Sequence, residues 1–256
     1  MLIKAKSIRN YKIMANDGEI GKVDEFFFDD QYWTVRYLVV DTGKWLSHYQ
    51  VLISPYAVLS VNEDAELINI NLSKQQVQES PGWDSDMPVS RQYETNYFKY
   101  YGYPVYWAGS MMWGPYPFIS RNRNDWNATV ENEHHWNPHL YSTKDVTGHS
   151  IQATDGEIGH VTDFIIDDST WAIRYLVVDT MNWWPGKKVL VSIQWIDRVS
   201  WNELKVYVSL SREQIKLAPE YTDKILLDRD YETRLHQYYD REGYWTEEPA
   251  ERDHSF

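Results

Sequence analysis

The chain contains no cysteine among its 256 residues. This absence excludes disulfide bonds, thiolate catalysis and cysteine-ligated metal or iron–sulfur sites. Basic residues are also in the minority, since 25 Lys and Arg against 38 Asp and Glu give a formal net charge of −13 at pH 7. Because binding to a phosphate backbone requires clustered Lys and Arg, we do not expect nucleic acid as a partner.

Long apolar runs are missing as well. No stretch approaches the roughly 20 apolar residues that a membrane-spanning helix needs, and the opening MLIKAKSIRNYKIM lacks the apolar core of a signal peptide. We therefore expect a protein without a membrane span that resides in the cytoplasm. Hydrophobic residues still make up 43% of the chain, with 13 Trp and 20 Tyr, which is enough for well-packed cores.

One short sequence, RYLVVDT, occurs twice, at 36–42 and again at 174–180. The match extends in both directions without a gap. DGEIGKVDEFFFDDQYWTVRYLVVDT in the first copy aligns with DGEIGHVTDFIIDDSTWAIRYLVVDT in the second. The repeated unit covers residues 2–107 and 140–245, about the length of an ordinary domain, so we predict two domains made by duplication.

Within each copy we separate a barrel from an aromatic-rich extension, which we term the arm. YETNYFKYYGYPVYW in the first copy aligns with YETRLHQYYDREGYW in the second. The predicted division is a first barrel at 1–83 with its arm at 84–107, an irregular connector at 108–139, a second barrel at 140–221 with its arm at 222–245, and an acidic tail at 246–256.

Each barrel is predicted to be mainly β-structure. The Asp17-Gly18 pair favours a tight hairpin, and Gly21 indicates a bulge or a close backbone approach. The YLVV run is apolar at consecutive positions, which is typical of a strand covered on both faces in a small closed barrel. Ser73 resembles a helix N-cap and predicts a short helix after the last strand. The second copy repeats all these features.

The DGEIG turn, the RYLVVDT strand, the VLIS strand and the serine-led helix resemble the PRC-barrel family. This fold forms the cytoplasmic domain of the photosynthetic reaction centre H subunit and the C-terminal domain of the ribosome maturation factor RimM. The resemblance implies two tandem small β-barrels, of the stand-alone bacterial type, that dock onto other proteins. It further implies a link to reaction-centre assembly and electron transfer, or to a stress response, and it brings no catalytic residues.

The arms carry the candidate interaction surface. Aromatic side chains in a polar background bury large area at low entropic cost, so we interpret the arms as straps. They could lie on their own barrel, on the sister barrel or on a second subunit. The candidate residues are Tyr93, Tyr97, Tyr100, Tyr101, Trp107, Tyr231, Tyr238, Tyr239 and Trp245.

Arg36 and Asp41 stand at the two ends of the repeated strand. Five residues apart on a strand, they lie on opposite faces and about 16 Å apart, so they cannot form one binding site. We expect Arg36 to pair instead with an acid on the neighbouring strand, Asp24 or Glu25.

Two groupings of acidic residues have the composition of a catalytic or metal site. Asp29 and Asp30, like Asp167 and Asp168, are neighbours whose side chains point to opposite faces of a strand, so we interpret each pair as a turn. A cluster in the connector contains histidines, but Pro138 disfavours the helix that would align them. We interpret it as a solvated linker, with a weak divalent-metal site as the alternative. Its members are Glu131, Glu133, His134, His135 and His139.

From these observations we expect a non-enzymatic scaffold or adaptor that binds other proteins, with no catalytic residue, metal or cofactor. The copies keep turns and apolar strands, whereas polar residues with catalytic potential differ between them. The competing hypothesis is a small-ligand or metal-binding protein, or an enzyme, that uses the cleft between the barrels and the aromatic arms. Both a monomer with pseudo-twofold symmetry and a homodimer are compatible with the duplication.

Overall fold

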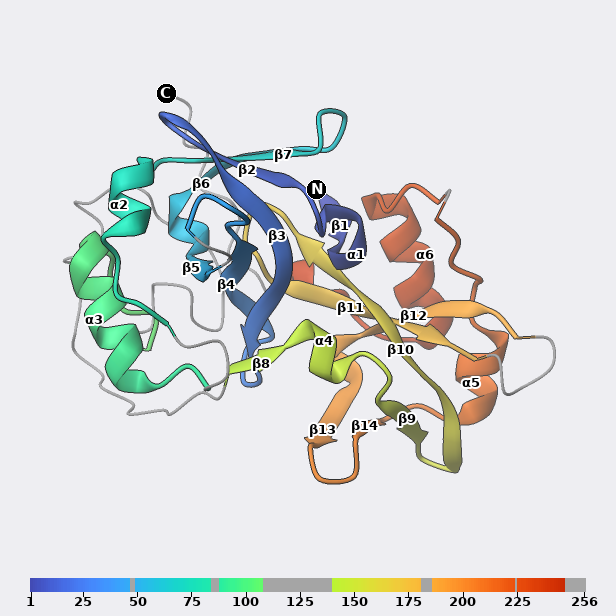
Figure 1. Ribbon diagram of the computed structural model, residues 1–256. Coiled ribbons are helices and arrows are strands. Elements are labelled where there is room, and N and C mark those ends of the chain that lie inside the picture. The colour runs from blue at the N-terminus through green and yellow to red at the C-terminus, as the bar shows by residue number, and fades with distance from the viewer. Residues whose placement is uncertain (47–48, 84–87, 108–139, 181–185, 224, 247–256) are drawn as a thin grey trace. The chain divides into compact units, whose positions relative to one another are not determined.

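The computed structural model describes residues 1–46, 49–83, 88–107, 140–180, 186–223 and 225–246. These residues form two seven-stranded sheets with few helices (Figure 1). The sheets confirm the predicted fold class, two tandem β-barrel-like repeats. No helix within these ranges is long and apolar enough to cross a membrane.

The first sheet has the strand order β5-β4-β3-β2-β7-β6, with β8 added beside β3. All neighbouring strands are antiparallel except β2 and β7, which run parallel. The strands are β2 (Lys12–Ala15), β3 (Gly18–Asp29), β4 (Thr34–Asp41), β5 (Gln50–Ile53), β6 (Val58–Asn62), β7 (Leu67–Ile70) and β8 (Leu140–Ser142).

The second sheet repeats this order as β12-β11-β10-β9-β14-β13, with β1 (Leu2–Lys4) added beside β10. Its other strands are β9 (Ser150–Ala153), β10 (Gly156–Asp167), β11 (Ile173–Asp179), β12 (Lys188–Ser192), β13 (Ile196–Ser200) and β14 (Lys205–Val208). The helices are α1 (Ala5–Ile8), α2 (Lys74–Gln78), α3 (Arg91–Tyr101), α4 (Thr143–Val146), α5 (Arg212–Leu217) and α6 (Arg229–Tyr239).

The chain divides into two compact units whose boundaries differ from those of the sequence repeats. The smaller unit contains residues 1–2, 148–162 and 175–256, and the larger contains 3–147 and 163–174. The boundaries of the smaller unit fall inside β10 and near the start of β11. The larger unit therefore includes two short segments of the second repeat, 140–147 and 163–174, together with residues 3–107 of the first repeat.

Equivalent residues of the two repeats pair with each other inside the larger unit. The Val35 N–H donates to the Trp171 carbonyl at 2.8 Å, and the Ile173 N–H donates to the Trp33 carbonyl at 2.7 Å. β8 adds the start of the second repeat to β3 of the first, where Phe27 lies opposite Ser142. Reciprocal bonds between equivalent residues are typical of a twofold-related contact, here within one chain.

The DGEIG turn works as the sequence predicts. β2 and β3 form a hairpin in which Ala15 lies opposite Gly18, and a register shift marks a bulge just after the turn. The Asp17 carboxylate accepts a hydrogen bond from the Lys74 N–H at 2.8 Å, so the turn also holds the start of α2. A Cβ on Gly21 would lie 2.1 Å from the Asp41 carbonyl oxygen, which confirms the predicted close approach.

The predicted central strand and capped helices are confirmed. All residues of β4 except Asp41 are buried, as the YLVV run indicated. Ser73 caps α2 by accepting from the Gln76 N–H, and the Gln76 side chain accepts in turn from the Ser73 N–H, which completes a capping box. Ser211 does the same for α5.

The predicted partners of Arg36 were wrong. Its Nε lies 2.8 Å from the Asp29 carboxylate, and both side chains are fully buried. The register of β3 against β4 shifts at Arg36, since Phe27 lies opposite Tyr37 and Phe28 opposite Val35. Arg36 is therefore close to Asp29 at the end of β3, whereas Glu25 lies further along, opposite Val39. Asp24 pairs instead with Lys144, at 2.7 Å.

Asp29 also performs the predicted turn role. Its carboxylate accepts hydrogen bonds from the backbone N–H groups of Gln31 and Tyr32, at 3.1 and 2.7 Å. In the second repeat Asp167 accepts from the Ser169 N–H at 3.1 Å and pairs with Arg174, also at 3.1 Å. Burial alone would raise the pKa of Asp167, but Arg174 and the Ser169 hydrogen bonds lower it.

Candidate interaction sites

Each arm contains a helix, α3 or α6, that is joined to its own barrel by a buried glutamate. Glu94 is 2% exposed. It accepts hydrogen bonds from the Tyr37 and Tyr106 hydroxyls at 3.0 and 2.6 Å, and its other oxygen lies 2.9 Å from Arg91. Tyr37 belongs to the central strand β4, so this network joins the arm to the middle of the barrel.

The second repeat contains the same network. Glu232 accepts from the Tyr175 and Tyr244 hydroxyls at 2.8 and 2.9 Å, and it pairs with Arg229 at 3.0 Å. These glutamates were not among the residues predicted from the sequence, although YET stands in both arms. That shared tripeptide is the signal by which the sequence marks them, among more conspicuous aromatic residues.

Burial shifts the pKa values of titratable groups in these networks. Desolvation raises the pKa of Glu94, while hydrogen bonds from Tyr106 and Tyr37 and the charge of Arg91 oppose the rise. In the second repeat His236 occupies the position of Phe98, and its Nε2 lies 3.0 Å from the Tyr175 hydroxyl. Burial lowers the pKa of His236. The second network therefore includes a titratable group where the first has a phenyl ring.

Four of the nine candidate aromatic residues are buried against their own repeat. Tyr97 donates its hydroxyl proton to the Leu52 carbonyl at 3.0 Å and accepts from the Ser54 N–H at 2.9 Å, which covers the outer edge of β5. Tyr239 packs on Trp195 with ring centroids 4.5 Å apart. The exposed fractions are 0% for Tyr97, 9% for Tyr101, 7% for Tyr231 and 3% for Tyr239.

The other five candidate residues reach the surface to different degrees. Trp107 lies under the guanidinium of Arg91 at 3.9 Å, and Trp245 lies under that of Arg229 at 4.2 Å. Tyr100 and Tyr238 are 40% and 39% exposed, and their hydroxyls donate to helix carbonyls. Tyr93 is half-buried and lines a pocket. The exposed part of the candidate surface is therefore concentrated in few residues.

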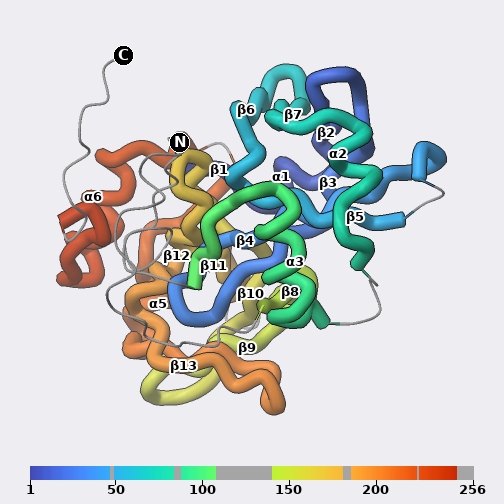
Figure 2. Tube along the Cα trace, turned by 90° about the vertical axis from the view of Figure 1, so that its left-hand side faces the viewer, coloured from blue at the N-terminus to red at the C-terminus, as the bar shows by residue number. Residues whose placement is uncertain are grey.

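That pocket lies in the first repeat, beside the outer edge of β5. It has a volume of about 520 Å³ and is bounded by the loop before β5, the segment that follows α2, and the start of α3. Figures 1 and 2 show α2 and α3 beside this part of the sheet. The lining residues are Trp45, Leu46, Tyr49, Gln50, Val51, Leu52, Val77, Gln78, Ser80, Pro81, Gly82, Trp83 and Tyr93.

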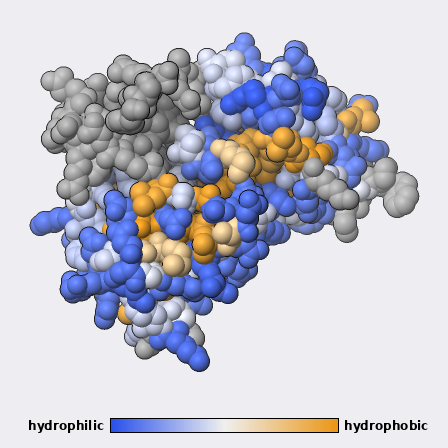
Figure 3. Space-filling model, turned by 90° about the horizontal axis from the view of Figure 1, so that it is seen from above, coloured by the Kyte–Doolittle hydropathy of each residue, from blue (hydrophilic) through white to orange (hydrophobic). Residues whose placement is uncertain are grey.

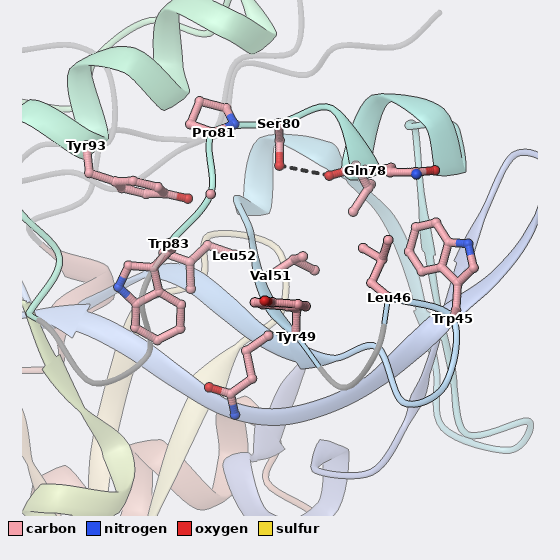
Figure 4. Close-up of a pocket in the computed structure, with 13 residues that line it drawn as sticks. Trp45, Leu46, Tyr49, Val51, Leu52, Gln78, Ser80, Pro81, Trp83 and Tyr93 are labelled. Atoms are coloured by element: carbon pink, nitrogen blue, oxygen red, sulfur yellow. Dashed lines mark hydrogen bonds between the residues drawn. The ribbon is translucent and has the colours of Figure 1, made fainter.

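Aromatic rings from different elements surround this pocket. Trp83 and Tyr93 lie on one side of it and Trp45 on the other (Figure 4). Trp83 meets Phe27 edge to face, with centroids 5.4 Å apart, and Lys74 lies 4.8 Å above the Trp45 ring. Tyr49 is 69% exposed. Such a pocket can take up an apolar or aromatic group, with a few polar side chains to orient it.

The residues described by the structure show no arrangement suited to metal chemistry. Within them, no group of three or more His, Asp or Glu side chains could hold a metal ion. The connector cluster lies outside the described ranges. Its members are Glu131, Glu133, His134, His135 and His139.

Fold and sites together define a duplicated small β-barrel whose recurring polar residues fasten its own parts together, the type of domain that serves interaction or scaffolding. The PRC-barrel domain model matches residues 1–77 and again 138–215, so more than half of the chain is covered. The chain belongs to the PRC-barrel domain family, as the sequence analysis expected. No curated protein matches the chain.

Proposed function

We propose that this protein is a non-enzymatic scaffold whose first repeat provides a docking pocket for other proteins. The observation that carries the proposal is the contrast between shared and differing residues. The two repeats share groups that hold the fold together, such as Gly21 and the buried Glu94 and their equivalents. They differ at the pocket, where Tyr49 and Trp83 of the first repeat are replaced by Lys187 and Tyr221.

The surface supports this function. On the face viewed in Figure 3, hydrophobic residues gather in patches among hydrophilic ones. Apolar surface patches with a polar rim mark interaction sites. The family consists of small interaction or scaffold domains, and the negative charge of −13 would favour partners with a basic surface.

A small planar ligand is the second candidate occupant of the pocket. The volume of about 520 Å³ lies within the range of small-molecule sites, and aromatic side chains line it. This candidate predicts a compound that stays bound through purification and is released on denaturation. The ligand hypothesis for the junction of the barrels stays a prediction, as do the alternatives of a monomer and a homodimer.

The proposed function is tested with the immobilised full chain in lysate of the source cells. Retained proteins are quantified by mass spectrometry at several salt concentrations, against a matrix without the chain. We expect a defined set of proteins to be retained, and their identities to decide between reaction-centre assembly and a stress response. Retention of nothing beyond the background of the bare matrix would overturn the scaffold function.

A further inference from the structure

The second repeat shows what fits beside the outer edge of the strand that lines the pocket in the first repeat. After α5, the segment 218–221 returns along β12, which is the equivalent of β5. The Tyr221 N–H donates to the Lys188 carbonyl at 2.8 Å, and the Lys187 ammonium donates to the Ala218 carbonyl. Tyr221 is only 3% exposed and Ala218 only 1%. The chain itself thus covers this edge with an extended segment that ends in an aromatic residue.

The first repeat has the same strands, but it lacks the lysine that fastens the segment 218–221 in the second repeat. Pro81 matches Pro219, but Tyr49 stands where Lys187 would provide the ammonium donor. Trp83, the equivalent of Tyr221, is only half-buried, and its ring lies against Phe27. The result is the pocket of about 520 Å³.

The burial of equivalent residues follows this difference. Val51 and Tyr93, which line the pocket, are half-buried, whereas their equivalents Val189 and Tyr231 are 0% and 7% exposed. The rim of the pocket includes Gln50, whose carbonyl is the equivalent of the Lys188 carbonyl that accepts from Tyr221. A peptide laid along β5 can therefore donate to this strand and bury a ring among Trp45, Trp83 and Tyr93.

We propose that the first-repeat pocket binds an extended segment of a partner protein in which an aromatic residue stands two positions after a proline, as Tyr221 does after Pro219 in this chain. The proposal rests on the scaffold function and specifies its partner chemistry. The bound segment takes the place that residues 218–221 occupy in the second repeat.

The test uses a blocked peptide, acetyl-Leu-Ala-Pro-Glu-Tyr-amide, which copies residues 217–221. It is titrated into the full chain while the indole N–H resonances of Trp45 and Trp83 are followed by NMR. We expect saturable shifts of these two resonances. The peptide with alanine in place of tyrosine should bind at least about tenfold more weakly, because it lacks the ring that fills the pocket.

Two variants of the full chain connect the binding to the pocket. Tyr49→Lys introduces the residue that the second repeat has at this position, so its ammonium can donate to the Ser80 carbonyl and close the pocket. Peptide binding should then be lost. Leu59→Ser changes a residue that is 56% exposed and does not line the pocket, so binding should be unchanged. Intact near-ultraviolet circular dichroism verifies that each variant is folded.

Several results would overturn the proposal. These are the absence of shifts at about 1 mM peptide, equal binding of the tyrosine and alanine peptides, and unchanged binding by Tyr49→Lys. Self-association of the unmodified chain that Tyr49→Lys abolishes would assign the pocket to a second copy instead. If the lysate experiment retains the same proteins with Tyr49→Lys, the peptide proposal fails while the scaffold function stands.

Discussion

The two repeats have the same arrangement of strands, but they differ at one outer edge of the sheet. In the second repeat, Lys187 and Tyr221 fasten the segment after α5 onto β12. In the first repeat, the corresponding edge of β5 borders a pocket lined by Trp45, Trp83 and Tyr93. In the second repeat the chain itself covers this edge, whereas the first repeat leaves room there for another molecule. Duplication permits this division, because one repeat can vary its surface while the other keeps a closed form.

The interior shows the opposite pattern. Glu94 and Glu232 make the same three contacts, and Gly21 and Gly159 make the same close approach to a neighbouring carbonyl. Because the interiors of the two repeats are alike, substitutions at equivalent core positions should change the free energy of unfolding by similar amounts. The exceptions are positions where burial differs, and these provide the most sensitive test of the comparison.

The buried ion pair is the first such position, and the one with the largest expected effect. Asp29 and Arg36 are both 0% exposed, whereas Asp167 and Arg174 are 14% and 7% exposed. Asp29→Ala leaves a buried guanidinium without its carboxylate and should cost about 3–5 kcal/mol of unfolding free energy. Asp167→Ala should cost about 2 kcal/mol. Urea unfolding of both variants measures the difference, and equal costs would contradict the unequal burial.

The glycine of the DGEIG turn should be equally sensitive in the two repeats. A Cβ would lie 2.1 Å from a carbonyl oxygen at Gly21 and also at Gly159. Each change to alanine should cost about 3 kcal/mol, because strand backbone must move to relieve the contact. Gly43→Ala is the control, since nothing lies within 4 Å of its Cβ position and only its φ of 55° is unfavourable. A thermal shift for Gly43→Ala as large as for Gly21→Ala would refute the steric explanation.

The sequence was sufficient to predict the turn, the central strand and the helix caps, because these depend on local residue types. RYLVVDT indicates a buried strand by its apolar run, and Ser73 indicates a cap by its position. The partner of Arg36 could not be predicted, because the register of β3 against β4 shifts at Arg36, and bulges leave little signal in a sequence. The pocket could not be predicted either. It depends on the path that the chain takes after α2 relative to the path after α5, although Tyr49 and Lys187 mark the difference.

The contact between the segment 218–221 and β12 should weaken when the ammonium group of Lys187 is removed. Lys187→Met removes the hydrogen bond to the Ala218 carbonyl while keeping a similar apolar stem. Because such a bond to a charged group contributes about 1.5 kcal/mol, we expect the Tyr221 amide to exchange with solvent about tenfold faster. Lys188→Met is the matched control, because the backbone carbonyl of residue 188, and not its side chain, accepts the Tyr221 N–H. Equal exchange in the two variants would show that Lys187 does not hold the segment.

The smallest expected effect is a pH dependence that only the second repeat should show. Burial lowers the pKa of His236 below its ordinary value, so below about pH 6.5 the unfolded chain takes up a proton that the folded arm resists. This contribution to stability is present above that pH and is lost as the pH falls toward the folded pKa. His236→Phe introduces the residue of the first repeat, which packs there on the aromatic rings of Tyr106 and Trp107.

Unfolding free energies at pH 7.5 and 5.5 measure this contribution. Relative to the unmodified chain, His236→Phe should be more favourable at the lower pH than at the higher. Phe98→His, the reverse exchange in the first repeat, should show the opposite trend, because it buries an imidazole near Glu94 and Tyr37. If His236→Phe leaves the pH dependence unchanged, the imidazole is as easily protonated in the folded arm as in the unfolded chain. The two arms would then differ in composition but not in their response to acid.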